Sequence, residues 1–478
     1  MNLLEVVTNR IFSRLALVAD SREYARLERF GLGATLVEAR RRDGTVLRGY
    51  KVPAKTADAP TVVFYCGNTG NASAHFPYIE ILHRADCNVI ALDYGGYGVS
   101  DGKADFSKLL EDAHIACDVA HREFGEDRPD FRIGLFGLSI GANIALRVGA
   151  QREDIRSIAA EGLSILQELI RGITLTGFVG PRSVTRLTID GEDLPEREAI
   201  SFPGIRGPRP IASFLATAAH FSYPFEGKDP CESANALRVP VLVAHGTSDR
   251  IFPFEAALEV YRRCPPGSKL WLLPGIGHAQ EPALNSDEEY AAQLRTFFRD
   301  NVHVGPEVRT TKNPDGEFQF ELGHAREPGA FLVALISEER VDFHRAWLEP
   351  DNNFRVSHDD PAAIPVALRM HCAKQSETGW EPVQSERARL FESIYGEHLR
   401  NLSRNLHASK VESGLEALEA FARLDPPFPF SHIGALHAAR LEALAQKKQP
   451  EIVQRATELF AHFQNTGSVA DYGLQMAD

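Results

Sequence analysis

The sequence of 478 residues predicts an α/β fold with a doubly wound, mostly parallel sheet. Over the first third of the chain, short apolar runs alternate with helical patterns, as they do when helices connect the strands of a parallel sheet. Two further runs typical of buried strands, residues 239–245 and 269–273, come after a stretch that is rich in Gly and Pro. We therefore expect the strands of one sheet to come from two separate parts of the chain.

The segment before the sheet is predicted to be helical, because apolar residues recur at helical spacing (Leu4, Val7, Ile11, Leu15 and Val18). Charges interrupt this stretch and no small-residue cleavage site follows, which is unlike a signal peptide. We expect it to pack on the protein's own surface rather than on a membrane. A β-hairpin should follow, because Asp43-Gly44 separates two strand-like runs.

The boundaries divide the chain into five predicted parts. These are a helical lead-in (1–33), the first part of the sheet domain (34–162), a helical lid insertion (163–235), the second part of the sheet domain (236–302) and a C-terminal module (303–478). A chain of this length is long enough for two to three domains with ample core.

A sharp turn at Gly137-Leu138-Ser139-Ile140-Gly141 carries the first chemical signal. It lies between an apolar strand run and a small-residue helical pattern, so the serine stands at the apex of a strand–turn–helix unit. The glycines leave room for the close approach of the backbone there. A serine hydroxyl becomes a nucleophile only when it is exposed, rigidly held and next to a base. We predict that Ser139 is a nucleophile.

The other two members of a catalytic triad follow in the expected order of serine, acid and histidine. Asp249 and His278 each stand in a loop just past a predicted strand, where catalytic groups collect in open α/β sheets. We assign His278 as general base and then acid, and Asp249 as the carboxylate that fixes the imidazole tautomer. Glu161, at the end of another strand run, is an alternative acid, and we favour Asp249.

An oxyanion hole is predicted from a third loop. The strand run 61–65 enters the loop 66–71, which reads Cys-Gly-Asn-Thr-Gly-Asn. Backbone amides aimed at a developing oxyanion are commonly the largest single catalytic contribution. The expected donors are the amide of Ile140, directly after the nucleophile, and the amide of Asn68.

These motifs together resemble the α/β-hydrolase superfamily. The chain is similar to small serine hydrolases whose oxyanion loop reads His-Gly-Asn-x-Gly-Asn and whose next strand ends in Asp-Tyr-x-Gly-Tyr-Gly-x-Ser-x-Gly, here residues 93–102. The resemblance covers roughly residues 35–302, with a poor match over about 163–235. It implies hydrolysis of acyl esters, thioesters or amides without a cofactor. Cys66 stands where the family has a histidine that braces the loop, so the resemblance leaves the rigidity of this loop open.

The insertion at 163–235 is where α/β-hydrolases place a lid, and we expect it to cover Ser139 and to shape the substrate pocket. The candidate lining residues are Cys66, Phe178, Phe202, Phe214 and Phe221. Alternatively, the aromatic residues form the core of the lid itself.

The C-terminal module, residues 303–478, lies outside the resemblance. Strand patterns occupy residues 307–350 and helical stripes dominate from 385 onward, so we expect a mixed α+β, mainly helical module. It shows no second catalytic set, and its histidines 432 and 437 are not spaced as ligands on a helix. The sequence leaves open whether the module holds a protein partner, builds a homo-oligomer or caps the active site.

Composition limits the remaining functions. The 52 basic and 65 acidic residues give a net charge of −13, and no basic stripe is present, so we expect no nucleic-acid partner. The six scattered cysteines lack metal-ligand spacing and favour a reducing, cytoplasmic compartment; we expect neither a metal nor a cofactor. No apolar run approaches 18 residues, which argues against stable membrane insertion.

Two functional hypotheses remain. The first is a serine hydrolase that cleaves a small-molecule acyl ester or thioester through an acyl-enzyme intermediate. Amidase or peptidase, C–C bond hydrolase and acyltransferase activities use the same triad and remain alternatives. The second is a non-catalytic interaction scaffold built on a hydrolase body, with the C-terminal module as its binding part. The sequence does not specify the acyl group, the leaving group, the pathway or the oligomeric state.

Overall fold

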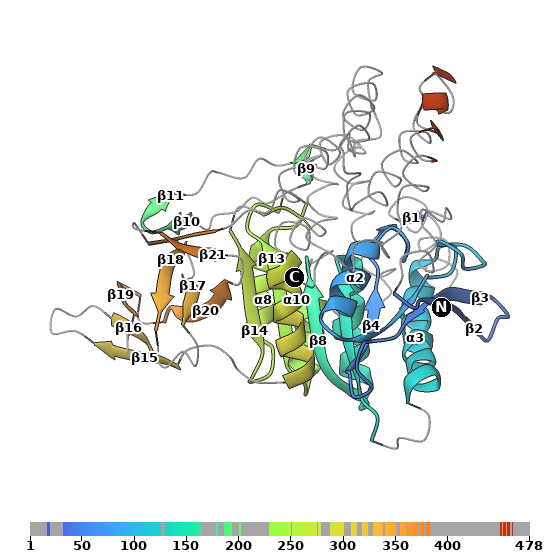
Figure 1. Cartoon of the computed structure of the whole chain (residues 1–478), viewed down its shortest axis with the longest axis horizontal. Coiled ribbons are helices and arrows are strands. Elements are labelled where there is room, and N and C mark those ends of the chain that lie inside the picture. Colours follow the sequence, from blue (N-terminus) through green and yellow to red (C-terminus); the bar gives the residue numbers. More distant parts are fainter. Residues whose placement is uncertain are drawn as a thin grey trace, which may run out of the picture.

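The computed structural model describes the central part of the chain and most of the strands that follow it (Figure 1). The described residues are 17–19, 32–125, 130–163, 178–179, 186–193, 200–201, 229–249, 251–274, 276–278, 287–300, most of 307–382, and single residues and short pieces within 450–461. The predicted lead-in helix and the predicted helices from 385 onward lie almost entirely outside these residues.

A central sheet of eight strands forms the middle layer, in the order β14-β13-β8-β7-β4-β6-β3-β2. Six neighbouring strands, from β14 to β6, are parallel, and the hairpin of β3 and β2 is antiparallel. The prediction of a mostly parallel sheet drawn from two parts of the chain is confirmed. The strands are β2 (Thr35–Arg40), β3 (Val46–Val52), β4 (Thr61–Tyr65), β6 (Asn88–Leu92), β7 (Ile133–Leu138), β8 (Ile155–Glu161), β13 (Val241–Gly246) and β14 (Lys269–Leu273).

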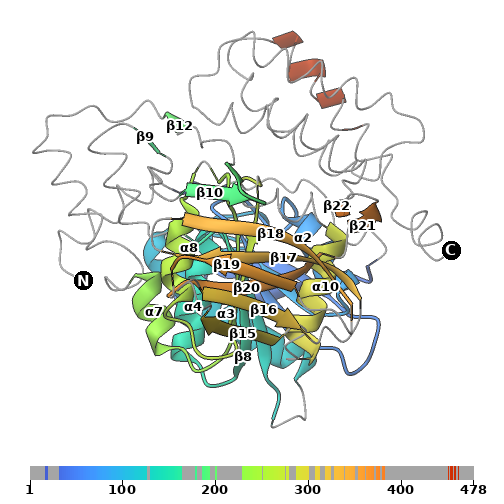
Figure 2. The same ribbon diagram turned by 90° about the vertical axis from the view of Figure 1, so that its left-hand side faces the viewer.

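Helices cover both faces of this sheet (Figure 2). Every residue of β4, β6 and β7 is buried, which explains their continuous apolar runs. One layer contains α3 (Leu109–Phe124), α4 (Ile140–Gln151), α7 (Pro230–Ala236) and α8 (Phe254–Tyr261); the other contains α2 (Phe76–Arg84) and α10 (Asp287–Arg295). Short helical turns lie at η2 (Phe106–Lys108) and η3 (Thr296–Asp300).

A second sheet of five strands, in the order β11-β10-β18-β17-β20, lies at the β14 end of the central sheet (Figure 1 and Figure 2). Its strands are β10 (Arg186–Ile189), β11 (Glu192–Asp193), β17 (Gly329–Ile336), β18 (Arg340–Leu348) and β20 (Ile364–Met370). The first two belong to the insertion, and β10 pairs in parallel with β18 of the C-terminal module.

This pairing differs from the helical lid that the sequence predicts for the insertion. The described residues 186–193 form a hairpin with φ of 51° at Asp190 and 87° at Gly191, and helix α7 closes the insertion. Asp-Gly in a two-residue turn with both φ values positive is a strong hairpin signal, so the turn was visible in the sequence. Its partner strand was not, because β18 lies about 150 residues further along the chain.

Strand β17 is buried along its whole length because it faces two cores. Leu332, Ala334 and Ile336 belong to the apolar core that extends into the central domain. The alternate residues Phe331 and Val333 belong to a separate core with the three-stranded sheet β15-β16-β19. The C-terminal sheet is therefore joined to the central domain by a shared core. The remaining strands are β1 (Val18–Ala19), β5 (Thr69–Gly70), β9 (Phe178–Val179), β12 (Ile200–Ser201), β15 (Glu307–Lys312), β16 (Phe318–Gly323), β19 (Phe354–His358), β21 (Ala373–Ser376) and β22 (Gly379–Pro382).

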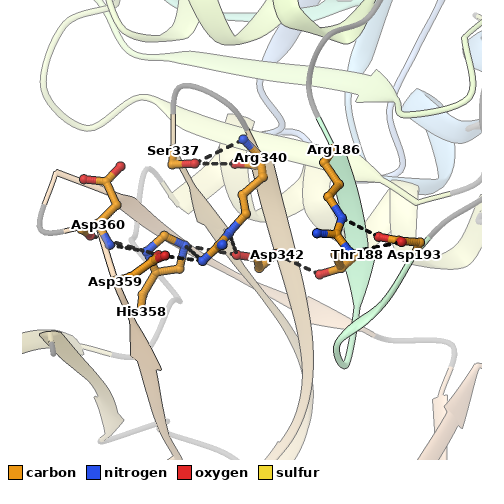
Figure 3. Close-up of polar contacts among 9 residues, drawn as sticks. All are labelled: Arg186, Thr188, Asp193, Ser337, Arg340, Asp342, His358, Asp359 and Asp360. Atoms are coloured by element: carbon orange, nitrogen blue, oxygen red, sulfur yellow. Dashed lines mark hydrogen bonds and ion pairs between the residues drawn. The ribbon is translucent and has the colours of Figure 1, made fainter.

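A polar cluster fastens the insertion strand to this sheet (Figure 3). Asp342 accepts hydrogen bonds from Thr188 Oγ1 (2.9 Å) on β10 and from Arg340 Nε (2.6 Å), and lies 3.0 Å from His358 Nε2. Burial acts to raise the pKa of Asp342, but these hydrogen bonds and the guanidinium charge outweigh it and lower the pKa below its usual value. The ionised carboxylate therefore links three strands.

Replacement of Asp342 by Ala should destabilise the protein by about 3 kcal/mol, because three polar partners lose a common acceptor. The loss should shrink in acid: a lowered pKa gives stability that is present above about pH 4 and disappears as pH falls through the folded-state value. Urea unfolding at pH 7 and pH 3 measures both effects. Asp359→Ala, which removes a carboxylate that is 73 % exposed, is the matched control. Equal unfolding free energies for the two variants would contradict this account.

Candidate active site

The turn between β7 and α4 holds Ser139 in an unusual backbone conformation. Its φ is 57° and its ψ is −115°, a region that a non-glycine residue rarely adopts. The Ser139 amide donates to the carbonyl of Glu161 at 2.8 Å, which fixes the turn to β8. A Cβ on Gly137 would overlap the carbonyl of Gly141, and one on Gly141 would overlap the carbonyl of Tyr65. The two glycines thus permit the contact that presents Ser139.

The three residues of the predicted triad come together at the carboxyl ends of β7, β13 and β14. His278 Nε2 lies 3.2 Å from Ser139 Oγ, and His278 Nδ1 lies 2.6 Å from Asp249 Oδ2. Since an ionised carboxylate only accepts, Nδ1 carries the proton and Nε2 is left to accept from the serine hydroxyl. The ring of Phe252 packs edge-on against the imidazole, with centroids 5.1 Å apart. This order of groups can transfer a proton away from Ser139.

Asp249 is fully buried, and its charge is met by several donors. The amides of Ile251 and Phe252 both donate to Oδ1 at 2.8 Å, and His245 Nε2 lies 3.1 Å from Oδ2. Burial acts to raise the pKa of Asp249, but the two histidines and their hydrogen bonds hold the pKa well below its usual range. The carboxylate of Asp249 is therefore ionised in the folded protein at neutral pH.

Glu161, the alternative acid in the sequence, faces other partners. Its carboxylate accepts hydrogen bonds from Tyr78 Oη at 2.6 Å and from Tyr290 Oη. Burial raises the pKa of Glu161 to about 7. The proton on His278 Nδ1 points to Asp249 instead, so the two carboxyl groups have different hydrogen-bond partners.

The loop predicted to donate to an oxyanion lies against the nucleophile. A Cβ placed on Gly67 would be 3.7 Å from Ser139 Cβ. The Ile140 amide lies at the amino end of α4, where the first amides have no partner within the helix and the helix dipole favours negative charge. The amides of Ile140 and Asn68 therefore belong to the two segments that flank Ser139.

Three residues of the loop after β6 form hydrogen bonds with the loop 66–72. None of them was assigned this role from the sequence. Tyr94 Oη donates to the Cys66 carbonyl at 3.3 Å, and Tyr97 Oη donates to Asn68 Oδ1 at 3.2 Å. Asp93 Oδ1 accepts from the amide of Ala72 at 2.7 Å. These three hydrogen bonds hold the loop that begins at Cys66.

The predicted pocket residues fall into two groups. Cys66 is 1 % exposed and belongs to the central apolar core, where burial raises the pKa of its thiol well above the usual value. Phe178 lies in β9, while Phe202, Phe214 and Phe221 lie outside the described residues. The lining of the substrate pocket thus stays a prediction.

Two buried histidines near the triad were missed by the sequence analysis. His245 lies inside a strand run, and His75 is the residue directly before helix α2, so neither position stood out. His75 Nδ1 is 2.9 Å from the Asn71 carbonyl, and its Nε2 would be 3.4 Å from a Cβ on Gly67. The ring therefore lies against the oxyanion loop.

The residues that the structure describes contain no cluster of three or more His, Cys, Asp or Glu side chains placed to hold a metal ion. No helix among them is long and apolar enough to cross a membrane.

About half of the chain is similar to a protein family and to several known proteins. Residues 62–293 match the model of the alpha/beta hydrolase family. The uncharacterized protein YfhR of Escherichia coli K12 is 27 % identical over 270 residues, which are 55 % of this chain and 80 % of that protein. The alpha/beta hydrolase domain-containing protein aho-3 of Caenorhabditis elegans is 27 % identical over 238 residues, 50 % of this chain and 57 % of that protein. A solved esterase of Pyrococcus furiosus is 21 % identical, with a TM-score of 0.44 over 60 % of this chain and 98 % of its own.

Replacement of Gly141 by Ala should destabilise the protein by about 2–3 kcal/mol, because the new Cβ meets backbone carbonyl oxygens that cannot rotate away. Gly149→Ala on the same helix is the matched control, since its Cβ meets the side-chain end of Ile158, which can move. Urea unfolding of both variants measures the difference. Equal stabilities would mean that α4 and β4 do not pack as closely as the distances at Gly141 indicate.

Proposed function

We propose that the protein is a serine hydrolase of acyl esters or thioesters, built on the central domain that matches the alpha/beta hydrolase family over residues 62–293. One observation carries the proposal: the hydrogen-bonded series from Ser139 Oγ through both nitrogens of His278 to Asp249 Oδ2. It joins a nucleophile, a base and an ionised buried carboxylate in the order that acyl transfer needs.

Acylation begins when Ser139 Oγ attacks the acyl carbonyl carbon and His278 Nε2 takes the hydroxyl proton. Asp249 keeps Nδ1 protonated and stabilises the imidazolium that forms. The amides of Ile140 and Asn68 donate hydrogen bonds to the carbonyl oxygen and stabilise the negative charge that develops on it. The alcohol or thiol then leaves with the proton from His278, and the acyl group remains on Ser139.

Deacylation reverses the roles with water. His278 Nε2 takes a proton from water as the water oxygen attacks the acyl carbon. The same two amides again donate hydrogen bonds to the oxyanion. Ser139 Oγ leaves with the proton from His278, which releases the carboxylic acid and restores the free enzyme. No cofactor is needed for either half of the cycle.

A fluorophosphonate probe tests the nucleophile, because it reacts with activated serines and mimics the acylation step. We expect one adduct per chain in the intact mass of the wild type, none in Ser139→Ala, and one in the control Ser337→Ala. Circular dichroism verifies folding in each case. The scaffold hypothesis would be favoured instead if Ser139→Ala still formed the adduct, or if the folded wild type formed none.

The brace on the oxyanion loop should affect turnover more than binding. Tyr97→Phe removes one hydrogen bond to Asn68 and should lower kcat roughly fivefold, equivalent to about 1 kcal/mol of transition-state stabilisation, with KM nearly unchanged. Hydrolysis of p-nitrophenyl butyrate measures both constants. Tyr261→Phe, on helix α8, is expected to keep wild-type kcat. A rise in KM at constant kcat would assign Tyr97 to substrate binding rather than to the loop.

A further inference from the structure

His245 lies on β13 directly before the loop that carries Asp249, and its side chain is fully buried. Its Nε2 is 3.1 Å from Asp249 Oδ2, the same oxygen that His278 Nδ1 approaches at 2.6 Å. The carbonyl oxygen of Phe252 is 3.3 Å from the same Nε2. Because both neighbours are acceptors, Nε2 is the protonated nitrogen of His245.

The other ring nitrogen of His245 has a different environment. Nδ1 is buried and has no hydrogen-bond partner among the described residues. A buried polar atom without a partner costs free energy. Val241 and Val243, which precede His245 on the strand, are apolar, as packing in this layer requires. Packing alone therefore gives no reason for an imidazole at this position, whereas the donor on Nε2 does.

On these contacts, and resting on the proposed function, we propose that His245 is a positioning residue for the catalytic carboxylate. Its Nε2–H holds the Oδ2 oxygen of Asp249 in line with His278 Nδ1 and shares the charge of that oxygen. The two amide donors act on Oδ1 only, so among the described residues His245 is the second donor to the oxygen that His278 approaches.

Loss of the Nε2–H donor should shift the pH dependence of catalysis in one direction. Without the Nε2–H donor, more negative charge remains on Oδ2, which favours the protonated form of His278. The acidic limb of the pH profile of kcat/KM should then move to higher pH. The titratable groups that face this site are His245 on β13, His278 after β14 and Glu161 at the end of β8. Both histidines act to lower the pKa of the Glu161 carboxyl group. Because replacement of His245 also acts on Glu161, Glu161→Gln made in each background separates the titration of Glu161 from that of His278.

The experiment compares the wild type with His245→Leu and His245→Gln on p-nitrophenyl butyrate from pH 5 to pH 9. Gln keeps two amide protons that can reach Asp249 and Phe252, whereas Leu keeps the approximate volume without a donor. We expect Leu to lower kcat about tenfold and to move the acidic limb up by about 0.5 in pH. Gln should restore both to within about twofold of the wild type. His114→Leu, on the surface of α3, serves as the control.

A second measurement does not depend on the folding of the Leu variant. In ¹⁵N-histidine NMR of the wild type, assigned with His245→Gln, we expect the proton of the His245 ring to lie on Nε2, where both neighbouring atoms are acceptors. A protonated Nδ1 would overturn the inference. So would an acidic limb that moves to lower pH in His245→Leu, or one that stays in place while kcat falls.

Fluorophosphonate labelling of the same samples separates this inference from the function on which it rests. The positioning role is supported if the wild type and both variants are labelled and only His245→Leu has an altered kcat. A folded wild type without an adduct means that the proposed function fails, and the role of His245 falls with it.

Discussion

The close approach of helix α4 to strands β4 and β7 is the constraint on which the rest of the site depends. It is possible only because Gly137 and Gly141 have no side chain, and it forces Ser139 into a backbone conformation with positive φ. The strain is held by the hydrogen bond from Ser139 to β8 and by the packed sheet around it. The same contact places the amino end of α4 beside the loop 66–71, so one backbone arrangement positions Ser139 and the amides that we propose as oxyanion donors.

The second requirement is an ionised carboxylate in a site that excludes water. Burial alone would raise the pKa of Asp249, and the loop 249–252 offsets this by folding two amides onto Oδ1. The two histidines act on the other oxygen. Elsewhere, the C-terminal sheet shares the apolar core of the central domain and pairs with a strand of the insertion. The insertion and the C-terminal module are thus structurally coupled parts of one molecule.

The sequence predicts the parts of this structure that depend on local pattern. The turn glycines, the order of Ser139, Asp249 and His278, and the parallel sheet all follow from short runs of residues. Contacts between distant segments could not be predicted in this way. Tyr97 meets Asn68 across two loops, β10 pairs with a strand about 150 residues away, and His245 looked like one more residue of a buried strand. Each depends on tertiary packing, which a single sequence does not display.

If Ser139 is the nucleophile, it carries the acyl group during turnover. Acid quenching of the wild type during hydrolysis of p-nitrophenyl butyrate, followed by peptide mass spectrometry, locates that group. We expect one butyryl group, on the Ser139 side chain of the peptide that contains it. A butyryl group on another residue, or a burst of p-nitrophenol that leaves every residue unmodified, would contradict this expectation.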